Sequence, residues 1–159
     1  MREACSNHRW ALWTTRQLRG VVPAQVRVLV VDDNPIAAEA LAAALDAEGF
    51  ITRYALGGVE AIDISSTWMP HVVILDINMP EYDGFQTASI MRRLATTRDA
   101  KIIAFTALGE SDVLPRGPAV GFDGYCQKGT SLTLLTDLIG VSLPSTRTST
   151  YSASRIGLN

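Results

Sequence analysis

The sequence predicts a single α/β domain in which a five-stranded parallel sheet carries helices on both faces. From Arg27 onward, short apolar runs rich in β-branched residues alternate with amphipathic stretches, the pattern of repeated strand–helix units. Several of these runs are apolar at nearly every position, as strands buried on both faces are. The chain has 159 residues, 47% of them hydrophobic, which is enough for one substantial core but not for two ordinary domains.

Five strands are expected in order along the chain. They are Val28–Val31, Ile51–Leu56, Val72–Leu75, Ile102–Phe105 and Gly124–Gln127. The first, third and fourth are nearly continuous apolar runs, so we expect them at the centre of the sheet. The second and fifth have weaker patterns.

Four helices are expected between and after these strands: Pro35–Glu48, Val59–Thr67, Gly84–Ala95 and Ser131–Ile139. Their apolar residues recur at helical spacing, and Gly49 supplies a stop for the first helix. The segment Ser111–Val120 holds two prolines and a glycine. Because a proline inside a helix removes a hydrogen bond and clashes with the preceding turn, this fourth helix of the fold should be short or irregular.

Both ends of the chain differ from this pattern. Residues 1–24 are expected to be an extension that is disordered or weakly helical, and residues 144–159 a disordered tail rich in serine and threonine. The folded domain should therefore occupy residues 25–143. That part carries 8 basic and 15 acidic side chains, a balance that argues against direct binding of nucleic acid.

Cysteine content and hydropathy indicate the compartment. Cys5 and Cys126 are too few and too far apart for a disulfide framework or a zinc site. No apolar run approaches the ~18 residues of a membrane span, and the N-terminus lacks the apolar core of a secretory signal. We expect a cytoplasmic protein that does not associate with membranes.

Polar residues follow four of the five expected strands, where the carboxyl ends of parallel strands form one edge of the sheet. They are Asp32 and Asp33, Asp76, Thr106, and Lys128. Three neighbouring carboxylates would repel one another unless a cation lay among them. With oxygen ligands and no histidine or cysteine in the set, Mg²⁺ or Mn²⁺ is the expected ion. A carboxylate nucleophile beside an ammonium and a hydroxyl is suited to phosphoryl transfer.

Four segments resemble the receiver domains of response regulators, the chemotaxis-regulator-like phosphoacceptor domains of two-component and phosphorelay signalling. They are VLVVDDNP (28–35), VVILDINMPEYDGF (72–85), IIAFTA (102–107) and GYCQKG (124–129). The resemblance covers about residues 26–140. It implies a flavodoxin-like, doubly wound sheet with the strand order 2-1-3-4-5.

The resemblance also implies a role for each matching residue. Asp76 would be the phosphoacceptor. Asp33, Asp76 and the backbone carbonyl of Asn78 would ligate Mg²⁺, and Asp32 would hold an ion-bound water. Lys128 would pair with Asp76 or with a phosphoryl oxygen, and Thr106 would move to hydrogen-bond that oxygen, leaving room for Tyr125 to turn inward.

The family's partners are implied in the same way. A histidine kinase or phosphotransfer protein would phosphorylate the domain, and a downstream effector would contact a surface formed by residues 111–120, Gly124–Gln127 and Ser131–Ile139. The protein would not be an enzyme in the ordinary sense, but an acceptor that assists its own phosphorylation and dephosphorylation. Gly129 departs from the family pattern, which usually has a proline after the lysine, so the lysine loop is expected to be held less tightly.

Several alternatives remain at this stage. The chain could be a receiver fragment of a hybrid histidine kinase or of a larger response regulator, or a degenerate receiver that binds partners without phosphorylation. A phosphatase of the haloacid dehalogenase type is disfavoured, because Asn78 stands where that family has a second acid. Taken singly, each aspartate would more often be a helix cap, and Asp83 with Gly84 indicates a turn and a helix start.

Overall fold

The computed structural model describes residues 8–18 and 21–140, and in this part of the chain six strands form one sheet. The strands are β1 (Trp10–Leu12), β2 (Arg27–Val31), β3 (Ile51–Ala55), β4 (Val72–Leu75), β5 (Lys101–Thr106) and β6 (Gly124–Gln127). Their order is β1-β6-β5-β4-β2-β3, and β2 to β6 are parallel. Counted without β1, this is the predicted order 2-1-3-4-5, so the predicted sheet is confirmed.

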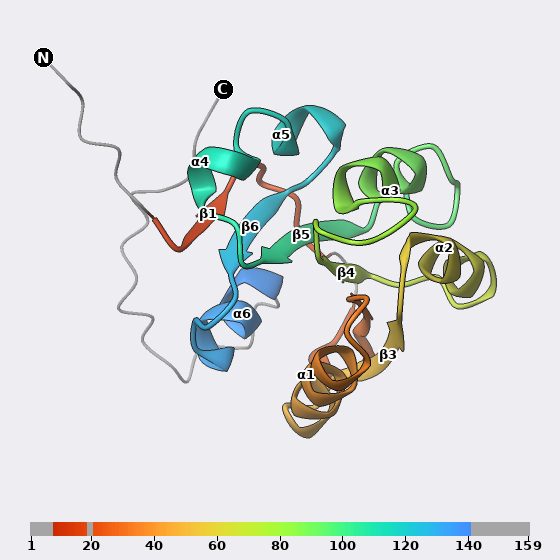
Figure 1. Cartoon of the computed structure of the whole chain (residues 1–159). Helices are drawn as coiled ribbons and strands as arrows, with labels where there is room; N and C mark the ends of the chain where they lie inside the picture. The colour runs from red at the N-terminus through yellow and green to blue at the C-terminus, as the bar shows by residue number, and fades with distance from the viewer. Residues whose placement is uncertain (1–7, 19–20, 141–159) are drawn as a thin grey trace, which may run out of the picture.

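Helices cover both faces of the sheet (Figure 1). They are α1 (Pro35–Ala47), α2 (Gly58–Thr67), α3 (Gly84–Met91), α4 (Glu110–Val113), α5 (Gly117–Val120) and α6 (Leu132–Ile139). α1 and α6 pack on one face, and α2, α3 and α4 on the other, each with its own core cluster. All four side chains of β4 are buried, as the apolar run at its position predicted.

The fourth helix of the predicted fold is divided into the two four-residue pieces α4 and α5. Pro118 is the second residue of α5, and Gly121 ends the helix in the left-handed region at φ 112°, where glycine carries no steric penalty. The prediction of a short or irregular helix is confirmed. The prolines set these limits, because a proline is tolerated in the first turn of a helix but not beyond it.

The N-terminal part of the chain differs from the prediction. Residues 10–12 form β1, which pairs antiparallel with β6, and Pro23–Gln25 form a single 3₁₀ turn, η1. The expectation of a disordered or weakly helical extension is wrong for these residues, because β6 offers a sheet edge whose backbone groups a short strand can pair. Residues 1–7 and the predicted tail at 144–159 lie outside the described residues.

None of the helices in the described part of the chain is long and apolar enough to cross a membrane.

Candidate functional site

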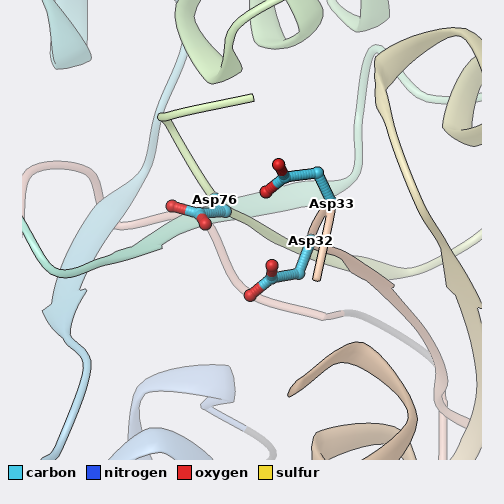
Figure 2. A group of neighbouring side chains, drawn as sticks. All are labelled: Asp32, Asp33 and Asp76. Carbon is cyan, nitrogen blue, oxygen red and sulfur yellow. The ribbon is translucent and has the colours of Figure 1, made fainter. Parts of the chain in front are cut away.

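Three carboxylates gather at the carboxyl ends of two central strands. Asp32 and Asp33 follow β2, and Asp76 follows β4; one oxygen from each lies within 4.8 Å of the others (Figure 2). Asp32 and Asp76 are buried, whereas Asp33 is exposed. The sequence prediction that these three residues share one edge of the sheet is therefore confirmed in its geometry.

Backbone hydrogen bonds fix the two buried aspartates. The amide of Asp76 donates to the carbonyl of Val31 at 2.9 Å, and its own Oδ1 accepts from the amide of Ile77 at 2.7 Å. Asp32 Oδ1 accepts from the amide of Asn34 at 2.9 Å. The side chain of Asn34, not that of an aspartate, caps α1. The aspartates are therefore not needed as caps of this helix.

Lys128 links the two buried carboxylates from the end of β6. Its Nζ donates to Asp32 Oδ2 at 2.6 Å and to Asp76 Oδ2 at 2.9 Å. Burial alone lowers the pKa of Lys128, but hydrogen bonds and attraction from Asp32 and Asp76 outweigh it, so the pKa is raised above its ordinary value. The ammonium therefore stays charged at neutral pH, and both oxygens of Asp76 are held.

The donor set fits a divalent cation. Three carboxylates and one ammonium leave a formal charge of −2, and two of the carboxylates, those of Asp32 and Asp76, are buried. Such an imbalance favours binding of a hard cation. Within the described residues, no ion pair involves Asp33. Its exposed carboxylate is thus the one best placed to accept an ion from solvent.

Thr106 is the last residue of β5, and its side chain is buried. Its Oγ1 accepts from the amide of Leu108 at 3.3 Å, and its carbonyl accepts from the amide of Lys128 at 2.8 Å. The hydroxyl therefore lies where β5 passes into the loop before α4, and the backbone of Thr106 is hydrogen-bonded to that of Lys128. Movement of Thr106 would be transmitted to both Leu108 and Lys128.

Tyr125 already lies inward, on the α3 and α4 side of β6. Its ring is fully buried, and its hydroxyl donates to the carbonyl of Leu108 at 2.7 Å. Burial, with a smaller contribution from Glu110, raises the pKa of this phenol to about 12. The tyrosine therefore remains a neutral donor and ties β6 to the loop that carries Thr106.

The remaining predicted residues occupy the surrounding loops. Asn78 is exposed in the loop that follows Asp76. Asp83 caps α3 in a capping box with Gln86, which confirms its interpretation as a helix start. Gly129 has φ +88°, a value that the fixed φ of proline excludes. The backbone after Lys128 therefore has a conformation that a proline at this position could not adopt.

Two groups of residues around β6 were not predicted as parts of this region. Trp13 stacks on Tyr125 with ring centroids 6.3 Å apart, and Arg9 donates to the carbonyl of Lys128 at 3.2 Å. At the other end of β6, the buried Asp123 pairs with Arg92 at 2.7 Å and with Arg16 at 3.0 Å. Asp123 lies at the amino end of β6, opposite the carboxyl ends where the polar residues of the site gather, and its signal in the sequence is an aspartate within the run GFDGYC.

The chain is similar in sequence to known response regulators. A family model described as the response regulator receiver domain matches residues 28–140. The response regulator MprA of Mycobacterium sp. (strain KMS) is 35% identical over 103 residues, which make up 65% of this chain and 44% of the relative. The transcriptional regulator RpaA of Synechocystis sp. is 28% identical over 102 residues, or 64% and 42% of the two chains. The matched part of the chain thus spans less than half the length of these two relatives.

Solved structures show the same fold. The chemotaxis protein CheY4 of Vibrio cholerae superimposes with a TM-score of 0.69 at 28% identity, covering 74% of this chain and 98% of that one. The response regulator TrrA of Thermotoga maritima, solved with Mg²⁺ and BeF, gives a TM-score of 0.63 at 34% identity, covering 71% and 95%. With most of its length matched by the family model and its acidic cluster at the expected edge of the sheet, this chain belongs to the response regulator receiver domain family.

Proposed function

We propose that Asp76 is the phosphoacceptor of this receiver domain, with Lys128 and Thr106 receiving oxygens of the phosphoryl group. The observation that carries the proposal is the bridge from Lys128 Nζ to Asp32 and Asp76 inside a cluster of three carboxylates. A structural ion pair would need one carboxylate. Three carboxylates and one ammonium instead suit a site that binds a cation and an incoming phosphoryl group.

The transfer requires a phosphorylated histidine on a histidine kinase or phosphotransfer protein. One oxygen of Asp76 forms a bond to phosphorus while the bond between phosphorus and the imidazole nitrogen breaks, and the electron pair leaves with that nitrogen. Hydrogen bonds from Ile77 and Lys128 orient the carboxylate for this attack. In dephosphorylation, water attacks phosphorus and releases inorganic phosphate and the free carboxylate, so the domain assists both steps without acting as an ordinary enzyme.

Mg²⁺, with Mn²⁺ as a substitute, is the proposed cofactor. Asp33 and Asp76 would be direct ligands, the carbonyl of Asn78 a third, and Asp32 would act through water. When bound, the ion would offset the negative charge shared by the phosphoryl oxygens and the carboxylates. The presence of Mg²⁺ with BeF in the structure of TrrA supports this assignment.

The proposed output is a change in the loop between β5 and α4. Phosphorylation adds about −1.5 to −2 charges at one point, which would draw the hydroxyl of Thr106 away from the amide of Leu108. The carbonyl of Leu108 holds the Tyr125 hydroxyl, so this movement would reach β6 and the neighbouring surface of α4 and α6. A downstream effector protein or domain would read that surface. We place these events in the cytoplasm.

The proposal is tested by intact mass after incubation with acetyl phosphate, with and without Mg²⁺. The wild type should gain a single phosphoryl group only with Mg²⁺, and Asp76→Asn should gain none. Asp63→Asn is the matched control, because Asp63 is an exposed carboxylate on α2 and its loss should leave uptake unchanged. Uptake by Asp76→Asn would move the acceptor elsewhere, and no adduct on the folded wild type would favour the degenerate, binding-only receiver.

A further inference from the structure

Residues 8–18, here called the N-terminal segment, contain β1, which covers the edge of β6 that does not pair with β5. β1 pairs with β6 in the register Trp10 with Cys126, Ala11 with Tyr125 and Leu12 with Gly124. Further bonds extend the ladder in both directions: Gln127 donates to Arg9 at 2.7 Å, and Trp13 donates to Asp123 at 2.8 Å. The family model begins only at residue 28, so this segment is an addition to the part that matches the family.

Side chains hold the N-terminal segment at both ends. Thr14 Oγ1 donates to Asp123 Oδ1 at 2.7 Å, and Arg16 Nε donates to the same oxygen at 3.0 Å. Asp123 is only 1% exposed, so it offers a buried anionic anchor. At the other end, His8 lies 3.4 Å from the carboxylate of Glu110 on α4. The segment thus runs antiparallel along β6 and contacts α4.

The receiving surface is shaped for a strand with a large aromatic side chain. A Cβ at Gly124 would lie 2.7 Å from the carbonyl oxygen of Ala11, and a Cβ at Gly117 would lie 2.8 Å from the Trp13 ring. Glycine at these two positions lets the strand and its indole approach closely. The indole stacks on Tyr125 at an interplanar angle of 10°, which closes the core over the tyrosine.

We propose that the edge of β6 is a docking site for an extended segment of a partner protein, and that the N-terminal segment occupies this site in cis. The fitting partner segment would pair antiparallel with β6, stack an aromatic side chain on Tyr125 and offer a hydroxyl or a cation to Asp123. Strand addition to a sheet edge gains affinity from backbone bonds and specificity from such pockets. A partner must displace the N-terminal segment first, so that segment acts as an intramolecular competitor.

This proposal rests on the proposed function only in taking the surface around β6 as the output surface; pairing with β6 itself needs no phosphoryl group. All measurements are therefore made on the full chain without Mg²⁺ or a phosphodonor. If the chain cannot be phosphorylated but still shows the hydrogen exchange and peptide binding described below, the proposed function is contradicted and the docking proposal stands.

The test combines hydrogen exchange with binding of a labelled synthetic peptide of residues 8–18. The amides of Trp13 and Thr14, which donate to the carbonyl of Asp123, should exchange slowly in the wild type and rapidly in Trp13→Ala, while β4 and β5 stay protected in both. The peptide should bind Trp13→Ala about tenfold more tightly than the wild type, because the competing segment is weakened. Trp68→Ala is the matched control, a half-buried tryptophan packed on the same core cluster, and should behave as the wild type.

Two outcomes would overturn the proposal. One is free exchange of the Trp13 and Thr14 amides in the wild type, which would mean that the segment does not occupy β6. The other is equal binding of the peptide to the wild type, Trp13→Ala and Trp68→Ala, or equal binding of a scrambled peptide, which would mean that β6 does not recognise the segment.

Discussion

Lys128 determines the charge balance at the two buried aspartates. Replacing it by alanine leaves Asp32 and Asp76 without the ammonium that contacts both. Because one preorganised donor to developing charge typically contributes about 10²-fold or more to a rate, phosphoryl uptake from acetyl phosphate should slow by roughly that factor in Lys128→Ala. The rate is measured by intact mass over time.

The same variant should bind Mg²⁺ more tightly, because the formal charge of the site becomes more negative. This opposite effect on the two measurements separates loss of the ammonium from general damage to the fold. Arg93→Ala removes an exposed cation beyond the end of α3 and should change neither quantity. An unchanged uptake rate in Lys128→Ala would remove the lysine from the transfer step.

His71 makes the stability of the folded protein depend on pH. Its Nδ1 accepts from the amide of Arg27 at 2.9 Å, which only the neutral ring can do. Burial first, and then the charge of Arg27, lower its pKa from 6.5. Above pH 6.5 the His71 ring is neutral in both the folded and the unfolded chain. Below pH 6.5 the unfolded chain binds a proton at His71 more readily than the folded chain does. Stability is therefore fully present above pH 6.5 and is lost as the pH falls through the lower folded pKa.

Urea unfolding at a series of pH values below 6.5 checks this prediction. The wild type should lose stability with a slope below the limit of about 1.4 kcal/mol per pH unit set by one proton. His71→Asn keeps an acceptor without a titrating ring and should flatten the slope. Equal slopes in the wild type and His71→Asn would contradict the assignment.

At the scale of elements, α3 approaches the end of β4 through Gly84. A Cβ at this position would clash with the carbonyl oxygen of Asp76 and would lie 2.7 Å from Cα of Ile77. Neither atom can move without shifting the loop that holds Asp76. Gly84→Ala should therefore lower the free energy of unfolding by about 1–3 kcal/mol, the usual cost of overpacking, and should also slow phosphoryl uptake.

Chemical denaturation measures the first effect, and intact mass measures the second. Gly57→Ala is the matched control, since a Cβ there has no heavy atom within 4 Å among the described residues and its φ of 175° suits any residue. A Gly84→Ala variant as stable as the wild type would show that α3 can shift without cost.

The elements also show which features could be predicted from the sequence. β2, β4 and β5 are predictable because strands buried on both faces need continuous apolar runs, and the polar residues that follow them locate the site. β1 is not predictable in the same way. Its three residues show no pattern longer than one alternation. They become a strand because Gly124 leaves space for Ala11 and Gly117 leaves space for Trp13, the residue that follows β1. That information lies more than a hundred residues away along the chain.

The whole molecule is coupled to its site because the acidic cluster joins distant parts of the chain. Asp32 follows β2, Asp76 follows β4, and Lys128 follows β6, so the cluster exists only when the sheet is formed. A ligand of the cluster binds the folded state and not the unfolded chain. By linkage, such a ligand must stabilise the entire domain and not only the loops that touch it.

Mg²⁺ should accordingly raise the melting temperature of the unphosphorylated chain. At ten times the dissociation constant, the gain is about 1.4 kcal/mol, which for a domain of this size corresponds to roughly 3–5 °C. Asp33→Asn should lose most of this shift, because the exposed carboxylate of Asp33 is the least compensated member of the cluster. Asp63→Asn, a neutralised carboxylate on α2, should keep it. A shift that is equal in all three proteins would place the ion outside the cluster. A shift in the wild type that Asp33→Asn abolishes would tie the stability of the whole sheet to the edge where Asp76 lies.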